Sequence, residues 1–307
     1  MMPVSRRQFL SSAAAAALLP AGSLIRAADP IVRTGKPFMK LSLAAYSFNK
    51  YLPSNRAAAS KTPPKMTLEQ FVDFCASLDL EGTELTSYYF PKDITPAYLN
   101  ALKAQTHRLG LDISGTAIGN DFCVADDEAM KEQLKLCRDW IDYSAALGAP
   151  VIRIFAGKVA KGETEEKAVE RCVAGIETSL EYAAEKGVAL ALENHGGITA
   201  TPAQLLSIVE KVKPSPWFGI NFDSGNFRTA DPYADLEQIA PYAINAQVKA
   251  TVTRGEGGKK EPSDFGRVVD ILKAAKYRGY LALEYEEPED PWETIPGLIK
   301  TLRGLVS

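Results

Sequence analysis

The sequence predicts an α/β fold, a single (β/α)8 TIM barrel, and three observations support this prediction. Short apolar runs rich in β-branched residues alternate with longer amphipathic runs, and this strand–helix unit occurs eight times. The eight units occupy about 265 residues, close to the roughly 250 residues of such a barrel. No linker divides the chain, and no G-x-G-x-x-G loop follows the first strand, which disfavours an open dinucleotide-binding sheet.

The predicted strands are the short apolar runs, bounded by turn residues. In chain order they cover residues 41–48, 82–86, 112–118, 151–156, 188–194, 218–223, 243–252 and 279–285. A long insertion, residues 50–65, follows the first of them. Because loops at this end of a TIM barrel surround its mouth, we expect the insertion to cover that mouth.

Helices are predicted between the strands from apolar residues at helical spacing. Thr67 is an expected N-cap, since Gln70 follows three residues later. Thr201 precedes a proline that can occupy the first position of another helix. The longest helical pattern, 163–186, ends at a glycine, and the last one covers 291–305.

The first 28 residues resemble an export signal rather than part of the fold. The segment Ser5-Arg6-Arg7-Gln8-Phe9-Leu10 has the twin-arginine pattern, and an apolar, alanine-rich stretch follows at 13–19. That stretch is too short to anchor a protein in a bilayer. We therefore predict a twin-arginine signal peptide over 1–28, a barrel domain over 38–307, and a periplasmic or otherwise exported mature protein.

Composition excludes several kinds of partner. The chain has 35 Lys and Arg against 38 Asp and Glu, and removal of residues 1–28 would leave 32 against 38, a net charge of −6. Such a surface disfavours nucleic acid and anionic membranes, and no later segment is apolar enough to span a membrane. The sequence permits a homo-oligomer without predicting one. The four cysteines form no C-x-x-C pair, and we expect buried thiols rather than disulfides.

Ligand-type residues stand at the ends of the last four predicted strands. Glu193, Asp223, Gln247 and Glu284 are separated by 30, 24 and 37 residues, about one strand–helix unit each. In TIM barrels the active site lies at the carboxyl ends of the strands, and side chains alternate between the two faces of a strand. We therefore expect these four side chains to converge inside the barrel mouth.

Three carboxylates buried together repel one another, and a divalent cation would offset that cost. The chain has only two histidines, so the ligands must be mainly oxygen atoms, which suits Mn²⁺, Mg²⁺ or Co²⁺ and allows Zn²⁺. We predict one divalent metal ion in this site. The alternative is a salt-bridge network in which Lys249, Arg153 and Arg254 neutralise the acids.

The ordered set Glu…Asp…(His/Gln)-x-Lys…Glu on the last four strands resembles the sugar phosphate isomerase/epimerase superfamily, the xylose isomerase-like TIM barrels. The segments that carry the resemblance are ALENHG, DSGN, AQVKA and LALEYE, and it covers nearly all of the mature chain. It implies that Glu193, Asp223, Gln247 and Glu284 hold one divalent ion. The usual His-x-Lys-Asp of strand seven reads QVKA here, and Gln as a ligand is known among lyase-type relatives. Two histidines exclude the three-metal endonuclease members.

The resemblance also implies that Glu193 and Glu284 act as catalytic acid and base. We predict an isomerase or epimerase that transfers a proton on an unphosphorylated sugar or keto-sugar, since phosphosugars are not expected outside the cytoplasm. One alternative is a metal-dependent lyase or dehydratase that eliminates from a 3-keto-glycoside or related polyol, with Lys249 or His195 as base or acid. Another is a non-catalytic sugar-binding barrel.

Residues near the strand ends are predicted to contact the carbohydrate substrate, namely Tyr46, Arg153, His195, Asn226 and Lys249. His195 lies two residues past Glu193 on the same face. Lys249 lies two residues after Gln247, so alternation along the strand points both side chains inward. Arg153 is a cation inside an apolar strand. For each of these three the structural alternative is a local hydrogen bond or a salt bridge with a buried acid.

Overall fold

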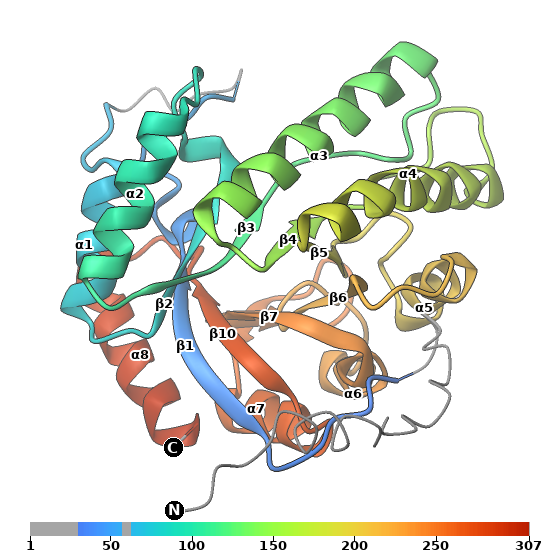
Figure 1. The fold of residues 1–307 in the computed structure, drawn as a ribbon. Helices are drawn as coiled ribbons and strands as arrows, with labels where there is room; N and C mark the ends of the chain where they lie inside the picture. The colour runs from blue at the N-terminus through green and yellow to red at the C-terminus, as the bar shows by residue number, and fades with distance from the viewer. Residues whose placement is uncertain (1–29, 57–62, 307) are drawn as a thin grey trace, which may run out of the picture.

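The computed structural model describes residues 30–56 and 63–306, and within them eight parallel strands form a closed barrel (Figure 1). The barrel strands are β1 (Phe38–Ala44), β2 (Gly82–Thr86), β3 (Asp112–Ala117), β4 (Val151–Ile154), β5 (Ala189–Glu193), β6 (Phe218–Asp223), β7 (Ala243–Lys249) and β10 (Arg278–Glu284). Strands consecutive in the chain are neighbours in the sheet, and β10 pairs with both β7 and β1 to close it.

Helices surround the barrel on its outer side (Figure 1). They are α1 (Leu68–Ser77), α2 (Pro96–Arg108), α3 (Asp127–Leu147), α4 (Glu165–Lys186), α5 (Pro202–Lys211), α6 (Pro232–Ile239), α7 (Phe265–Ala274) and α8 (Pro291–Val306). Short 3-10 helices η1 (Ala45–Phe48), η2 (Ser87–Tyr89) and η3 (Ala240–Tyr242) follow β1, β2 and α6. The predicted fold class, a single TIM barrel, is confirmed.

Side chains at the helix ends explain where the helices begin and stop. The Thr67 hydroxyl accepts a hydrogen bond from the backbone N–H of Gln70, whose side chain accepts one from the backbone of Thr67. Thr201 caps α5 in the same way by accepting from the backbone of Gln204. Each such cap stabilises its helix by about 1 kcal/mol. Gly187 ends α4 with φ of 70°, a conformation that favours glycine.

Two predicted strands were too long by three residues or more. The predicted strand 41–48 ends at Ala44, and its last four residues form η1, because Phe48 turns outward into an aromatic cluster with Phe71, Phe74 and Trp292. Phe48 is fully buried, so its apolar side chain continues the strand-like pattern in the sequence although the strand has ended.

The predicted strand 243–252 likewise ends at Lys249. At this end of β7, Ser224 forms hydrogen bonds with the strand. Its N–H donates to the Gln247 carbonyl, and its hydroxyl accepts from the Lys249 N–H. The following residues form a separate antiparallel hairpin, β8 (Thr251–Thr253) with β9 (Lys260–Pro262).

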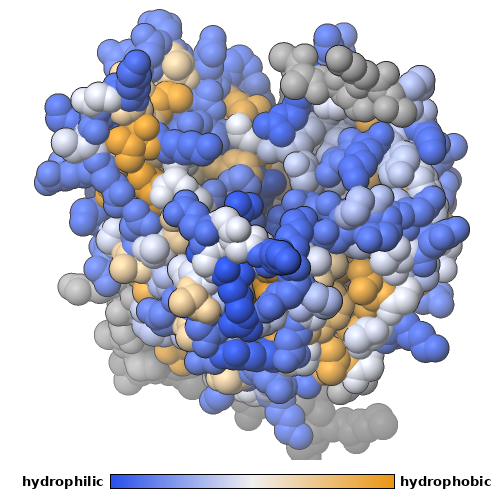
Figure 2. Space-filling model, turned by 180° about the vertical axis from the view of Figure 1, so that it is seen from behind, coloured by the Kyte–Doolittle hydropathy of each residue, from blue (hydrophilic) through white to orange (hydrophobic). Residues whose placement is uncertain are grey.

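Other expectations concern the core and the surface. All four cysteines are buried free thiols, as expected. The face shown in Figure 2 is mostly hydrophilic, with hydrophobic side chains in small separate groups. None of the helices among the described residues is both long and apolar enough to cross a membrane. The signal peptide predicted over 1–28 lies outside the described residues and stays a prediction.

Candidate active site

The four residues predicted at the strand ends come together inside the mouth of the barrel. Glu193 ends β5, Asp223 ends β6, Gln247 lies near the end of β7 and Glu284 ends β10. Their exposed fractions are 3%, 0%, 1% and 6%. Sheet register places Asp223 beside Gln247. The alternation predicted from the sequence therefore directs all four toward one interior site.

Buried amides join these acids across the barrel. Asn221 Nδ2 donates to Glu193 Oε2 at 2.9 Å and to Gln247 Oε1 at 2.7 Å. Gln247 Nε2 donates to Glu284 Oε2 at 3.1 Å and to Glu84 Oε1 at 2.6 Å. Because β2, which carries Glu84, is not a neighbour of β7, this last bond crosses the interior. The network fixes the Gln247 amide between two carboxylates.

Arg153 is the counter-ion of Glu193. Its Nε lies 3.0 Å from Glu193 Oε2, its Nη1 donates to the Ile118 carbonyl at 2.8 Å, and its guanidinium lies 3.9 Å from the centre of the Phe155 ring. Burial alone would lower the pKa of Arg153, but Glu193, Tyr88, Glu284 and Glu84 together outweigh burial, and the pKa is raised. Arg153 is therefore a permanent positive charge inside the barrel.

Lys249 is the counter-ion of the other acids. Its ammonium lies 2.8 Å from Glu284 Oε1 and 3.6 Å from Asp223 Oδ2, and it also contacts Glu286. Burial lowers the pKa of Lys249, but Asp223, Glu284 and Glu286 together outweigh burial and raise it well above its ordinary value. Lys249 is thus charged, and it bridges acids from β6, β10 and the loop after β10.

The carboxyl groups of Glu84 and Asp223 have pKa values well above the ordinary range. Burial, helped by Glu284, raises the pKa of Glu84 to about 7, although Arg153 opposes the shift. Burial also raises the pKa of Asp223 to about 7, with Lys249 opposing. Asp223 Oδ1 accepts from the Gly225 N–H at 2.8 Å, whereas the buried Asp223 Oδ2 has no hydrogen-bond donor among the described residues and faces the Lys249 ammonium at 3.6 Å.

A cavity of about 240 Å³ opens above these acids. Its lining includes all five residues predicted to contact a carbohydrate, together with Glu193, Glu284 and residues from several loops: Tyr46, Arg56, Tyr88, Arg153, Phe155, Glu193, His195, Asn226, Arg228, Lys249, Glu284 and Glu286. Asp223 and Gln247 lie below it, buried under the lining. The structure thus separates the predicted set into residues that a ligand can touch and residues that support them.

The ligand-facing groups include a neutral imidazole. Burial, with Arg153 and Lys249 nearby, lowers the pKa of His195 to about 4, so the ring carries no charge at pH 7. The ring lies against Phe155, with centroids 4.0 Å apart. Asn226 Nδ2 donates to Glu193 Oε1 at 3.0 Å. His195 can therefore donate or accept a hydrogen bond, but it is a poor base at neutral pH.

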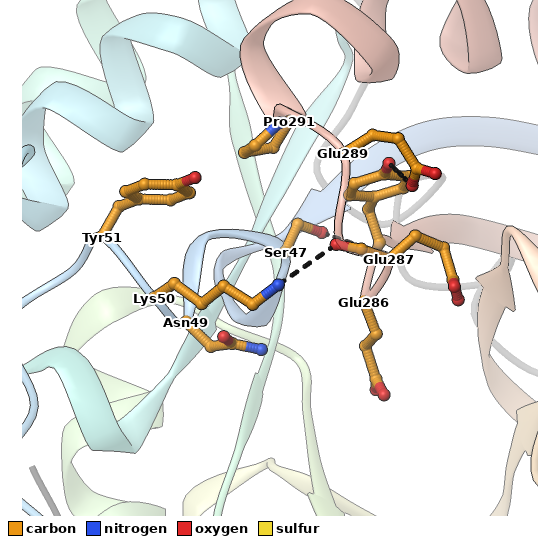
Figure 3. A pocket seen from close by; sticks show the side chains of 9 residues that line it. Ser47, Asn49, Lys50, Tyr51, Glu286, Glu287, Glu289 and Pro291 are labelled. Atoms are coloured by element: carbon orange, nitrogen blue, oxygen red, sulfur yellow. Dashed lines mark hydrogen bonds between the residues drawn. The ribbon is translucent and has the colours of Figure 1, made fainter. Parts of the chain in front are cut away.

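The loops after β1 and β10 are tied together beside this cavity (Figure 3). Lys50 Nζ donates to the Glu287 carbonyl at 3.3 Å, and Ser47 Oγ accepts from the Tyr285 N–H at 3.0 Å. Figure 3 shows the Glu286 side chain pointing away from the Lys50 bond. This contact holds residues 50–56 of the insertion at the barrel mouth, and residues 57–62 lie outside the described residues.

The donors suit the predicted metal ion, but internal cations also lie against them. The site offers carboxylate and amide oxygens, and Asp223 Oδ2 is a buried oxygen that a cation would partner. In 30–56 and 63–306, no three His, Cys, Asp or Glu side chains are grouped as a metal centre. The alternative salt-bridge network is present through Arg153 and Lys249, whereas Arg254, predicted as its third cation, pairs with Glu261 at 2.6 Å instead.

Several residues of the site were not predicted from the sequence. Asn245 Nδ2 donates to Asn221 Oδ1 at 2.8 Å and so extends the network. Asn221 and Asn245 each lie two positions before a predicted ligand, so period-two alternation could have placed them there. Glu84 was identifiable as an acid within a fully buried strand. Arg56 and Arg228 belong to loops, and no periodicity in the sequence indicates that they line the cavity.

The raised pKa of Glu84 predicts a pH-dependent stability for the metal-free protein. As pH rises from about 4.5 to 7, the unfolded chain loses the proton that the folded protein retains, so the free energy of unfolding falls by up to about 3 kcal/mol. E84Q removes this loss, and the variant should exceed the parent in stability above pH 7 and equal it near pH 4. Urea titrations across this pH range measure the difference.

The control for this prediction is E185Q, because Glu185 is exposed on α4. The control should follow the pH profile of the parent. An E84Q profile parallel to that of the parent would show that Glu84 ionises normally in the folded protein.

Comparison with known sequences matches this chain to a family and to a curated relative. The pattern of the family described as xylose isomerase-like TIM barrel matches residues 72–302. A protein of Mus musculus described as a putative hydroxypyruvate isomerase is 26% identical over 171 residues, which are 51% of this chain and 60% of that protein. The match therefore spans less than two thirds of the mouse protein.

Solved structures share the architecture. An L-ribulose 3-epimerase superposes with a TM-score of 0.67 and 18% identity, over 88% of this chain and 93% of the other. A xylose isomerase domain protein from Planctomyces limnophilus superposes with a TM-score of 0.65 and 18% identity, over 88% and 98%. At such identities the likeness shows the fold alone.

Proposed function

Because the chain belongs to the xylose isomerase-like TIM barrel family, we propose that it is an isomerase or epimerase of an unphosphorylated sugar or keto-sugar. The observation that carries this proposal is a pair of buried carboxylates, Glu193 and Glu284, which line one cavity from two separate strands. Arg153 lies against the first and Lys249 against the second. In this proposal the two carboxylates approach one carbon atom of the substrate from two sides.

The chemistry follows from these positions. One of Glu193 and Glu284 removes a proton from the carbon beside the carbonyl, and the electron pair of the broken C–H bond moves toward the carbonyl oxygen. The charges of Arg153 and Lys249 stabilise the negative oxygen that develops. The other Glu starts as the carboxylic acid, and return of its proton to the opposite face of the same carbon inverts that carbon. Return of a proton to the neighbouring carbon, with transfer of the hydroxyl proton to the former carbonyl oxygen, moves the carbonyl. Neutral His195 can hydrogen-bond the substrate throughout.

One divalent ion, Mn²⁺, Mg²⁺, Co²⁺ or Zn²⁺, belongs to the proposal. Glu193, Asp223, Gln247 and Glu284 would hold it. The donor chemistry supports this assignment, as does Asp223 Oδ2, which accepts no hydrogen bond from the described residues. When bound, such an ion polarises a carbonyl and so acidifies the neighbouring C–H. The surplus of buried carboxylates over Arg153 and Lys249 leaves negative charge for it to neutralise.

The names of similar proteins suggest the compounds to test. The protein would be incubated in D₂O with ketohexoses, with L-ribulose and with hydroxypyruvate, and each recovered compound analysed by mass spectrometry and NMR. Deuterium on a carbon beside the carbonyl is the expected result. Release of water or an alcohol would instead indicate the lyase. Tight sugar binding without deuterium or release would indicate the non-catalytic barrel.

Removal of the metal gives a separate prediction. Dialysis against EDTA is expected to lower the exchange rate about tenfold or more, and Mn²⁺ is expected to restore it, since the ion supplies the polarisation of the carbonyl. The metal content would be measured by inductively coupled plasma mass spectrometry in the same samples. Full activity in a preparation shown to be free of metal would contradict metal dependence while leaving the carboxylate pair intact.

Export by the twin-arginine route, to the periplasm or beyond, is also proposed, on the strength of the Arg6-Arg7 motif. The mature protein would then act on a small carbohydrate without nucleic acid or membrane partners. Replacing both arginines by lysine should retain the precursor in the cytoplasm of the host, as followed by cell fractionation. Unchanged export of that variant would contradict this route.

A further inference from the structure

Two arginines at the rim of the cavity have no acidic partner in the described part of the chain. Arg56 lies in the loop after β1 and Arg228 in the loop after β6, and both line the cavity and are exposed. We propose that they bind a carboxylate of the substrate, so that the protein acts on an acidic sugar, a sugar acid or keto acid, rather than on a neutral one. This inference rests on the proposed function, because it names the substrate class of the same cavity.

The balance of charge in the cavity supports an anionic ligand. The charged groups that line it are four cations and three acids: Arg56, Arg153, Arg228, Lys249, Glu193, Glu284 and Glu286. The two inner cations already contact all three acids, Arg153 through Glu193 and Lys249 through Glu284 and Glu286. Cations therefore outnumber acids by one in the lining, and the uncompensated charge lies at the rim with Arg56 and Arg228. The buried acids Glu84 and Asp223 lie below the lining, away from these two arginines.

Arg56 is positioned with its donors available. Its guanidinium lies 4.0 Å from the centre of the Tyr88 ring, and Tyr88 is only 7% exposed. Stacking uses the face of the guanidinium and leaves the N–H groups at its edge free to bind a carboxylate in a bidentate manner. The preceding residue anchors the loop, since the Asn55 N–H donates to the Tyr88 carbonyl at 2.8 Å and Asn55 Nδ2 to the Ser87 carbonyl at 3.0 Å.

Arg228 extends from an equally well-anchored loop. Phe227, just before it, is 1% exposed, and Asn226 donates to Glu193 at 3.0 Å. The arginine side chains are exposed, whereas the two carboxylates proposed for proton transfer are buried. A substrate would therefore bind with its carbonyl end inside, near Glu193 and Glu284, and its carboxylate at the mouth.

The test compares ligands that differ only in one charged group. D-glucuronate and D-glucose differ at carbon 6, where one carries a carboxylate and the other a hydroxymethyl group, and D-glucose 6-phosphate carries a phosphate there. Binding of each to the full protein would be measured by isothermal titration calorimetry at fixed ionic strength. The variants are R56Q, R228Q and their combination. The control is R254Q, because Arg254 is a cation of the β8–β9 hairpin that pairs with Glu261 and does not line the cavity.

We expect glucuronate to bind at least tenfold more tightly than glucose, with that advantage reduced below about threefold in the double variant and retained in R254Q. Equal binding of glucuronate and glucose would overturn the inference, as would an advantage that survives in the double variant. Tighter binding of glucose 6-phosphate than of glucuronate would overturn the assignment to a carboxylate.

The same experiment separates this inference from the proposed function. Deuterium exchange on neutral ketoses, with no preference for the acid, would overturn the substrate class and leave the isomerase proposal standing. A strong preference for glucuronate that depends on Arg56 and Arg228, without deuterium exchange on any sugar or sugar acid, would support the carboxylate subsite and count against the reaction.

Discussion

Replacement of Glu284 by glutamine is expected to lower turnover by about 10³- to 10⁴-fold while substrate affinity changes little. Glutamine has nearly the same shape and can still accept the hydrogen bond that Lys249 donates to Glu284 Oε1. It cannot take a proton from carbon at neutral pH. The loss should therefore appear in kcat, measured on whichever compound exchanges deuterium, and not in the dissociation constant measured by calorimetry.

The matched control for E284Q is E287Q. Glu287 lies three residues further along the chain, in the loop after β10, but its carboxylate accepts from Thr251 and Lys260 and does not line the cavity. Figure 3 shows its side chain directed away from that of Glu286. E287Q should retain nearly full turnover. E193Q should lose as much as E284Q if the two carboxylates share the proton transfer, and an active E284Q would exclude Glu284 as acid or base.

The positions of the four strand-end residues could be predicted from the sequence because two periodicities coincide there. The repeat of the strand–helix unit placed Glu193, Asp223, Gln247 and Glu284 at one end of the barrel, and alternation along each strand directed them inward. The strand–helix repeat and the alternation along a strand depend only on the spacing of residues in the chain, which can be read directly from the sequence.

Contacts between distant segments could not be predicted in this way. The bond from Gln247 to Glu84 joins strands that are not neighbours, and the rim position of Arg56 depends on its stacking against Tyr88. Phe48 shows the same limit for the fold, since its burial looked like a continuing strand but comes from packing against Phe71 after the chain has turned. An apolar residue in the sequence predicts that its side chain is buried, but not which residues it packs against.

Lys249 is where the salt-bridge network and the predicted metal site compete. Its ammonium lies among Asp223, Glu284 and Glu286, close to the oxygens proposed to hold a divalent ion. K249M removes that charge and keeps most of the apolar stem. In metal-free protein near pH 7.5, we expect the free energy of unfolding to fall by about 3–5 kcal/mol, because buried carboxylates lose their counter-ion. Urea titration in the presence of EDTA measures this change.

The pH dependence of the loss has a definite sign. Without Lys249 the carboxyl pKa values of Asp223 and its neighbours rise, so the folded protein holds protons that the unfolded chain has released. A group whose pKa is raised on folding contributes stability at low pH that disappears as pH rises. K249M should therefore approach the parent in stability near pH 4 and fall furthest below it above pH 7.

Mn²⁺ then distinguishes the two roles of the site. The variant leaves more negative charge for a cation to neutralise, so Mn²⁺ should bind more tightly and raise its stability more than that of the parent, in proportion to the logarithm of the added affinity. The control is K213M, because Lys213 also pairs with a glutamate, Glu177 at 2.9 Å, but on the surface. It should match the parent with and without Mn²⁺. If Mn²⁺ stabilises K249M and the parent equally, Lys249 and the metal do not share a position. If Mn²⁺ stabilises neither protein, internal cations alone balance these acids.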